Sequence, residues 1–308
     1  MLRWLKRTSI CYLCAVVLTP HSTWISGVSL LGRPKRSPLE RNTISFDVHI
    51  GWCWVQVLSA FDFDPTLRYM FCMTHPDDEI SICAFIRRLV LNGNEVFISW
   101  THSKPVREKE GRKVATLLGV PQEHLRFFNA TDGKVCDEIP DLLPRFKAWM
   151  DEVKPDRVCC GAFEQGHIDH DSTNFLVSES FKGPMFEIPF YHTYLTRLQT
   201  LNRFSDPRGE EILELNEEEQ DFKRTIAKCY PSQNIWSVLL WYEISQNVRG
   251  RRMQLAKTER MRQQVHFNFR RPNHPPKLAR RVKQSKTWKR WKSAIRAAYR
   301  ELENRQID

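Results

Sequence analysis

Two short clusters of histidine and carboxylate residues are the part of this chain best suited to metal binding or catalysis. The first is HPDDE at His75–Glu79, and the second is HIDH at His167–His170. Zn²⁺ accepts imidazole nitrogens and carboxylate oxygens in catalytic sites, where one coordination position stays open for water. His75 and Asp78 can converge on one ion, and one histidine of the second cluster can complete the set while the other faces a substrate. The clusters therefore predict a catalytic metal site.

Each cluster taken alone has a simpler interpretation. A His-Asp cluster on a loop is often solvated surface, and Asp77 or Asp78 could cap the helix that follows. Two such clusters, each placed directly after a buried apolar run, favour a shared site over two unrelated loops.

The segments around the clusters alternate between strand and helix patterns. Such alternation indicates βαβ units and a mainly parallel sheet, so the predicted fold class is α/β. In these sheets ligands bind beyond the carboxyl ends of the strands, and the loops Thr74–Glu79 and Glu164–Asp171 both follow predicted strands. We expect strands at Tyr69–Thr74, Glu95–Thr101, Leu125–Phe128, Arg157–Gly161 and Phe186–Tyr191, and helices at Ile80–Leu91, Val106–Leu118, Ile139–Val153, Ser172–Phe181, Glu217–Ala227 and Trp288–Leu302.

The two clusters resemble the signature motifs of the PIG-L/LmbE family of zinc-dependent N-acetylglucosaminyl deacetylases. Thr74 stands where the family's first motif commonly has alanine, and Ile168 stands where its second commonly has proline. A weaker similarity is Arg107-x-x-Glu110 followed by Leu118-Gly119. The resemblance covers roughly residues 69–233 and implies a Rossmann-like three-layer fold.

The resemblance also implies a role for each matching residue. The zinc ligands would be His75, Asp78 and His170. Asp77 would be the general base, and His167 the acid or the group that stabilises the oxyanion. Asp169 would orient His167 through its carboxylate, and Arg107 would contact sugar hydroxyls.

The function implied is removal of the N-acetyl group from a substrate that contains N-acetylglucosamine, with Zn²⁺ as cofactor. Amide hydrolysis needs an activated water, a stabilised oxyanion and a protonated leaving amine, and this residue set can supply all three. The alternative within the same chemistry is a zinc amidase that acts on a thiol conjugate or an antibiotic precursor.

Charge is distributed unevenly along the 308 residues. Between Arg68 and Leu240 there are 21 basic and 27 acidic residues, whereas the two flanks hold 26 basic and 9 acidic residues. The content of 41% hydrophobic residues supports a packed core and excludes global disorder. We therefore divide the chain into an N-terminal extension at 1–64, a deacetylase-like domain at 65–246, and a basic, partly helical C-terminal tail at 247–308.

The basic tail raises an alternative function of another class. From Arg249 onward it holds 19 Lys and Arg residues, with Trp288 and Trp291 interleaved. Cations contact phosphates, and aromatic rings stack on bases or insert into a lipid interface, so weak contact with nucleic acid or an anionic membrane is one hypothesis. The other is a solvated helix and flexible arm.

The N-terminal segment has three interpretations. Met1–Arg7 carries three positive charges, Thr8–Gly32 carries none, and Ile10–Leu18 is similar to the apolar core of a signal peptide, although polar residues follow at once. The segment could be an extension without function, a signal or weak anchor, or a folded part of the domain. The expected location is cytoplasmic, and membrane association through this segment is the alternative. The nine cysteines form no CxxC pair, which predicts reduced, buried thiols.

Overall fold

The computed structural model describes residues 46–50, 53–192, 200–250 and 254–304. The chain divides into two compact units, Met1–Glu40 and Arg41–Asp308, and all the described residues belong to the second. The interpretations of the N-terminal apolar segment thus fall outside the described residues. Among the helices that are described, none is long and apolar enough to cross a membrane.

Strands and helices alternate through most of the described chain. The strands are β1 (Phe46–Ile50), β2 (Cys53–Val57), β3 (Tyr69–Met73), β4 (Val96–His102), β5 (Leu125–Ala130), β6 (Arg157–Gly161), β7 (Met185–Ile188), β8 (Tyr191–His192), β9 (Thr200–Leu201), β10 (Glu210–Glu214) and β11 (Thr258–Gln263). The helices are α1 (Cys83–Leu91), α2 (Pro105–Leu118), α3 (Ile139–Val153), α4 (Ile168–Ser180), α5 (Glu217–Ala227), α6 (Ile235–Val248), α7 (Pro276–Gln284) and α8 (Lys286–Asn304).

The main sheet has seven strands in the order β10-β11-β7-β6-β3-β4-β5. The five strands from β7 to β5 are parallel, and β10 and β11 are antiparallel to their neighbours. The chain runs outward from β3 through β4 to β5, then returns to β6 on the other side of β3. The strand order therefore reverses between β3 and β6, and at such a switch point the loops beyond the carboxyl ends leave a crevice for a ligand.

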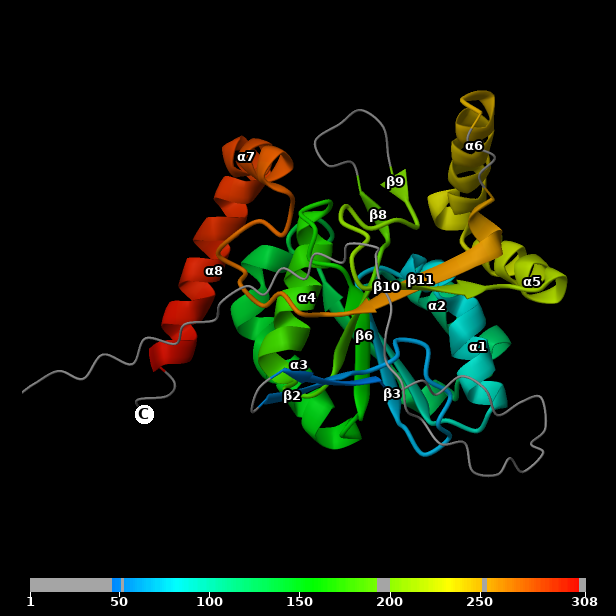
Figure 1. The fold of residues 1–308 in the computed structure, drawn as a ribbon, viewed down its shortest axis with the longest axis horizontal. Helices are drawn as coiled ribbons and strands as arrows, with labels where there is room; N and C mark the ends of the chain where they lie inside the picture. Colours follow the sequence, from blue (N-terminus) through cyan, green and yellow to red (C-terminus); the bar gives the residue numbers. More distant parts are fainter. Residues whose placement is uncertain (1–45, 51–52, 193–199, 251–253, 305–308) are drawn as a thin grey trace, which may run out of the picture. The chain divides into compact units, whose positions relative to one another are not determined.

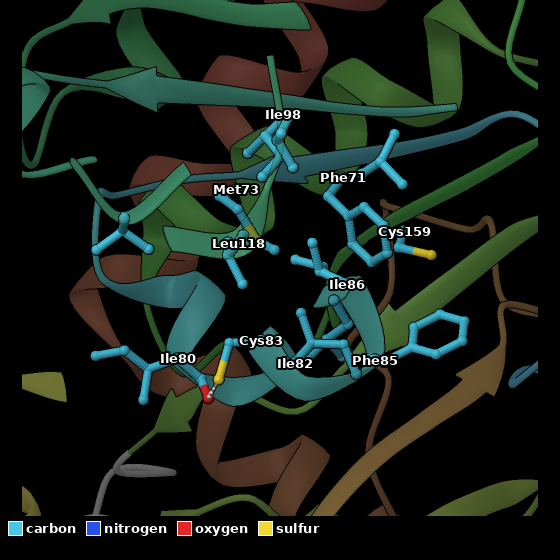
Figure 2. Close-up of a cluster of buried hydrophobic side chains, with 14 of the residues drawn as sticks. Phe71, Met73, Ile80, Ile82, Cys83, Phe85, Ile86, Ile98, Leu118 and Cys159 are labelled. Atoms are coloured by element: carbon cyan, nitrogen blue, oxygen red, sulfur yellow. Dashed lines mark hydrogen bonds between the residues drawn. The ribbon is translucent and has the colours of Figure 1, made fainter. Parts of the chain in front are cut away.

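Helices cover both faces of this sheet, with α1 and α2 on one side and α3, α4 and α8 on the other (Figure 1). Strand β3 is buried on both faces, and its side chains alternate between two apolar clusters. Phe71 and Met73 join Phe85 and Ile86 of α1 in the first cluster, shown in Figure 2. The predicted α/β class with a mainly parallel sheet in three layers is confirmed.

The second cluster contains Met70 and Cys72 of β3 and extends to the end of the described chain. Trp288 and Trp291 of α8 are only 3% and 1% exposed, and the Trp291 indole donates a hydrogen bond to the Phe269 carbonyl. These two rings are core residues of the sheet's second face, so they cannot stack on bases or enter a lipid interface. That part of the polyanion hypothesis is wrong.

The segment expected to form a separate tail also contributes to the sheet. Strand β11 lies between β10 and β7, and in the register Arg262 pairs with Glu187. The sequence pattern did not reveal this strand because TERMRQ alternates too weakly in hydrophobicity to indicate one. Six cysteines whose side chains are described are buried free thiols, as expected: Cys72, Cys83, Cys136, Cys159, Cys160 and Cys229.

Candidate metal centre

Both histidine clusters lie where the strand order reverses. The His75–Glu79 loop leaves the carboxyl end of β3, and the second loop leaves the carboxyl end of β6 and enters α4. His167 is the N-cap residue of α4, and its ring nitrogen Nδ1 accepts a hydrogen bond from the Asp169 backbone N–H at 3.3 Å. His170 follows in the first turn of the helix, which turns it toward the first loop.

The three residues expected to bind zinc converge on one point. His75 Nδ1 lies 3.2 Å from His170 Nε2, and His170 Nε2 lies 3.5 Å from Asp78 Oδ1. His75 Nδ1 lies 3.9 Å from the other Asp78 oxygen, Oδ2, and one ligand atom from each of the three residues lies within 4.8 Å of the other two. Two ligands of a tetrahedral zinc, each about 2.0–2.1 Å from the ion, are about 3.3 Å apart. The donor set and its spacing therefore fit a zinc ion.

The remaining atoms of these ligands are engaged by the protein. Asp78 Oδ2 accepts hydrogen bonds from the backbone N–H groups of Thr74 and His75, at 2.9 and 2.8 Å. The other oxygen, Oδ1, is thus the one turned to His170. On the far side of the His75 ring, Nε2 lies 3.5 Å from an Asp132 oxygen and 3.8 Å from an Asp169 oxygen. Carboxylates in this position orient a metal-binding imidazole and make it a stronger ligand.

The Asp169 carboxylate is placed differently from what the resemblance implies. Its oxygens accept hydrogen bonds from the backbone N–H groups of Gly133 and Val135, at 2.6 and 3.2 Å, and one of them faces His75. It also lies within 4.8 Å of a His167 ring nitrogen. Asp169 is therefore positioned to support the ligand His75 at least as directly as it supports His167.

Asp77 is held beside these ligands in an unusual backbone conformation. Its φ of 141° is rare for a residue with a side chain, and such outliers concentrate at functional sites. The Arg107 guanidinium donates to the Asp77 carboxylate at 2.8 Å and to the Pro76 carbonyl at 3.2 Å. The Glu79 carboxylate accepts from the Asp77 backbone N–H at 3.0 Å. Arg107 thus fixes the orientation of Asp77 as well as facing the cavity.

The electrostatics of the metal-free site favour a cation. Burial opposes the charged form of His75, but its contacts with Asp132 and Asp169 outweigh burial and raise its pKa to about 10. Burial and the neighbouring Asp78 raise the pKa of Asp77 to about 7, against the opposing effect of Arg107. Four carboxylates gathered around a buried point create a negative potential that a bound divalent ion would neutralise.

The part of the chain that surrounds this centre is similar to one known protein family. Residues 70–181 match the model of the family described as GlcNAc-PI de-N-acetylase, PIG-L. This part of the chain is similar to that family, and both clusters lie inside the matched region.

Solved structures with a similar fold include several deacetylases, and the likeness to the first of them supports the α/β fold described above. A triple mutant of a deacetylase from teicoplanin biosynthesis has a TM-score of 0.50 at 16% identity, over 65% of this chain and 99% of that chain. A conserved protein from Thermus thermophilus has a TM-score of 0.47 at 17% identity, over 65% and 95% of the two chains. N,N'-diacetylchitobiose deacetylase from Pyrococcus horikoshii has a TM-score of 0.45 at 18% identity, over 66% and 87%. The search of curated proteins gave no match.

A cavity of about 330 Å³ opens onto the candidate metal centre. Polar residues and apolar residues of α6 line it, the polar ones including His75, Asp77, Asp78 and His167 of the two motifs and Arg107 of α2. Its volume lies within the usual range for sites that bind small molecules.

Asp132 is a cavity residue that the sequence analysis missed. It follows β5, so its loop reaches the same edge of the sheet as the two motifs, and its carboxylate approaches His75. Its position after a predicted strand could have indicated a site residue. However, a lone aspartate in the sequence Thr131-Asp132-Gly133 is equally typical of a turn.

Phe190 lies against the candidate site next to His170, with ring centroids 5.2 Å apart in an edge-to-face arrangement. Gly161, the last residue of β6, allows this placement. A Cβ atom there would lie 2.7 Å from the Phe190 ring, well inside van der Waals contact. Glycine at the end of this strand therefore allows the Phe190 ring to reach His170.

The second loop of the candidate site is anchored by residues far along the chain. The Glu164 carboxylate accepts hydrogen bonds from the Ser205 backbone N–H at 2.9 Å and from its hydroxyl at 3.2 Å. The Glu164 carbonyl lies 2.5 Å from His274 Nε2, and the Asn273 backbone N–H donates to the Gln165 side chain at 3.0 Å. These anchors lie beyond the matched region, so the later part of the chain completes the site.

Proposed function

We propose that the protein is a zinc-dependent hydrolase that removes the N-acetyl group from an N-acetylated amino sugar. The observation that carries the proposal is the convergence of His75, Asp78 and His170, with one ligand atom of each within 4.8 Å of the others, beside the Asp77 carboxylate. The family description, de-N-acetylation, names the hydrolysis of an amide and agrees with this donor set.

The proposal assigns a residue to each step of amide hydrolysis. A zinc ion held by His75, Asp78 and His170 would supply Lewis acidity and lower the pKa of a bound water to about 7. Asp77, oriented by Arg107, accepts the proton of the attacking water. The same carboxyl group can return that proton to the leaving nitrogen, which releases acetate and a free amine. His167 lines the cavity on the other side, where a ring N–H can stabilise the oxyanion.

The cavity supports a sugar rather than a purely apolar ligand. Asp132, Asn202, Arg224 and Gln233 line it together with the catalytic groups. Such carboxylate, amide and guanidinium groups bind hydroxyls through directional hydrogen bonds, and the volume of about 330 Å³ accommodates a pyranose ring.

Acetate release from a panel of substrates tests the proposal. The panel holds N-acetylglucosamine derivatives, an N-acetylated cysteine conjugate and a glycopeptide precursor, and metal content is measured on the same preparation. We expect acetate from the N-acetylglucosamine derivatives and one zinc per chain. Release from the thiol conjugate alone would favour the amidase alternative, and a folded protein that takes up no metal would refute the proposal.

A further inference from the structure

Helix α6 has its polarity inverted relative to an ordinary surface helix. Of the eleven large apolar side chains that are strongly exposed in the described residues, five lie on this one helix of fourteen residues. Trp241 is 68% exposed and Val248 is 84% exposed. The full set on α6 is Val238, Leu240, Trp241, Ile244 and Val248.

Most polar side chains of α6 are at least partly buried, and Asn247 at its C-terminal end is the exposed exception. The Glu243 carboxylate accepts a hydrogen bond from the Leu255 backbone N–H at 2.6 Å, and the Tyr242 hydroxyl accepts one from the Leu201 backbone N–H at 3.3 Å. Gln246 is only 4% exposed. The single carboxylate of the helix is therefore turned away from the apolar face, which is free of negative charge.

This apolar face is continuous with the cavity of the candidate metal centre. Val238 and Leu240 are exposed and also line the cavity, together with Trp236 and Leu239 from the same helix. The helix extends away from the main sheet (Figure 1). An apolar patch of this kind at the rim of a binding site marks an interaction surface.

Cations lie at both ends of the apolar face. Lys228 is exposed, and its ammonium group lies 4.8 Å from the centre of the Trp236 ring at the start of α6. Arg249 is the exposed C-cap residue, and the sequence continues with Arg251 and Arg252, whose placement is not described. Tryptophan and aliphatic side chains between basic residues are the composition of helices that lie in an anionic lipid interface.

We propose that α6 is a docking surface for an anionic lipid membrane and lays Trp241, Ile244 and Val248 into the interface. Its fourteen residues span about 21 Å, less than the roughly 30 Å of a bilayer core, so the helix lies on the membrane and does not cross it. Lys228 and Arg249 then contact the lipid phosphates, and the cavity mouth faces the same surface.

A second copy of the chain fits this face less well than lipid does. In a two-fold pairing of antiparallel α6 helices, Lys228 of one copy would approach Arg249 of the other at each end. Like charges brought together in this way oppose association, whereas anionic headgroups match them.

Vesicle co-sedimentation tests the proposal with the full-length protein. We expect binding to phosphatidylcholine vesicles that contain phosphatidylserine, and binding several-fold weaker to phosphatidylcholine alone. The double variant Trp241→Glu/Ile244→Glu should lower the partition coefficient by about a hundredfold, because two buried apolar side chains are lost. Lys228→Ala should lower it by about fivefold.

A matched control uses two exposed leucines in the last turns of α1 and α2. Leu91→Glu/Leu117→Glu introduces the same charges on α1 and α2, where these residues are 76% and 42% exposed. It should bind vesicles like the wild type. Equal binding by the α6 variant and the wild type would overturn the proposal, as would the absence of binding to either vesicle.

The proposal is independent of the catalytic assignment, because the readout is vesicle binding. Trp241 and Ile244 do not line the cavity, so turnover of a water-soluble substrate should stay unchanged in the α6 variant. A wild-type dimer in sedimentation velocity that Trp241→Glu/Ile244→Glu converts to monomer would show a protein partner instead and would also overturn the lipid assignment.

Discussion

The two loops that form the candidate metal centre are fixed in different ways. The loop after β3 is held by its close neighbours: Asp78 binds the backbone of its own turn, and Asp77 binds Arg107 of α2. The loop after β6 is held by Ser205 and His274, which lie 41 and 110 residues from Glu164. One half of the site is therefore encoded locally, and the other half requires most of the chain to be folded.

This difference explains why a family match limited to residues 70–181 finds both motifs but not the whole site. The matched region contains the ligands, while the residues that anchor the second loop lie outside it. We therefore expect different effects from substitutions in the two regions. Those in the matched region should remove the chemistry, and those at the anchors outside it should disturb the geometry of the second loop.

Removing the ligand that the second loop contributes should have the largest effect. His170→Ala leaves two of the three proposed ligands, His75 and Asp78. We expect metal affinity to fall by more than a hundredfold, because mutation of a residue that merely hydrogen-bonds to a ligand already lowers metal affinity about 10- to 100-fold. Metal analysis and chelator competition measure this loss. His124→Ala, at a histidine bonded to the Val96 carbonyl away from the site, is the control. Stoichiometric, tight metal binding by His170→Ala would contradict the ligand assignment.

Asp77→Asn should separate chemistry from metal binding in the locally held loop. The amide keeps the shape of the side chain but cannot accept the proton of the attacking water. We expect turnover about 10²- to 10⁴-fold lower at unchanged zinc content, which steady-state acetate release and metal analysis measure together. Unchanged turnover would remove Asp77 from the mechanism, and loss of zinc would make it a ligand.

His274→Ala tests the long-range anchoring of the other loop. It removes the imidazole that contacts the Glu164 carbonyl and Ser205, and leaves a buried carbonyl without that partner. We expect metal affinity about tenfold weaker and a loss of about 1–3 kcal/mol in the free energy of unfolding. Metal titration and urea unfolding measure the two effects. A variant with wild-type metal affinity would show that the loop keeps its geometry without this anchor.

The same contrast explains what the sequence could predict. Most strands and helices from Tyr69 to Ala227 were predicted because their apolar periodicity is strong, and α3 and α5 have the predicted bounds. Strands β9 and β10 were not predicted, and α4 begins at Ile168 instead of Ser172. The first motif was readable because its ligands and supports lie within a few residues of each other. Asp132 and His274 were not identified because isolated polar residues gain their meaning only from tertiary contacts.

The C-terminal segment and α6 show the other limit of sequence analysis. Trp288 and Trp291 lie in a basic sequence that suggests a surface, but the rings face one side of α8 and enter the core. Helix α6 is apolar around most of its circumference, which in sequence indicates a buried helix. Only the structure reveals that much of this apolar surface is exposed.

The smallest expected effect is the pH dependence that His274 confers on the anchored loop. Burial lowers the pKa of His274 from 6.5 to about 4 in the folded protein. Between these values the unfolded chain binds a proton that the folded chain does not, so the free energy of unfolding decreases as the pH falls from about 6.5 to about 4. His274→Gln keeps a side-chain N–H donor for the Glu164 carbonyl but does not titrate. Urea unfolding of the metal-free proteins at pH 7 and pH 5 should therefore show up to about 2 kcal/mol more destabilisation for the wild type than for the variant. An equal pH dependence in both proteins would mean that His274 titrates normally and that its contact with the loop tolerates the charged form.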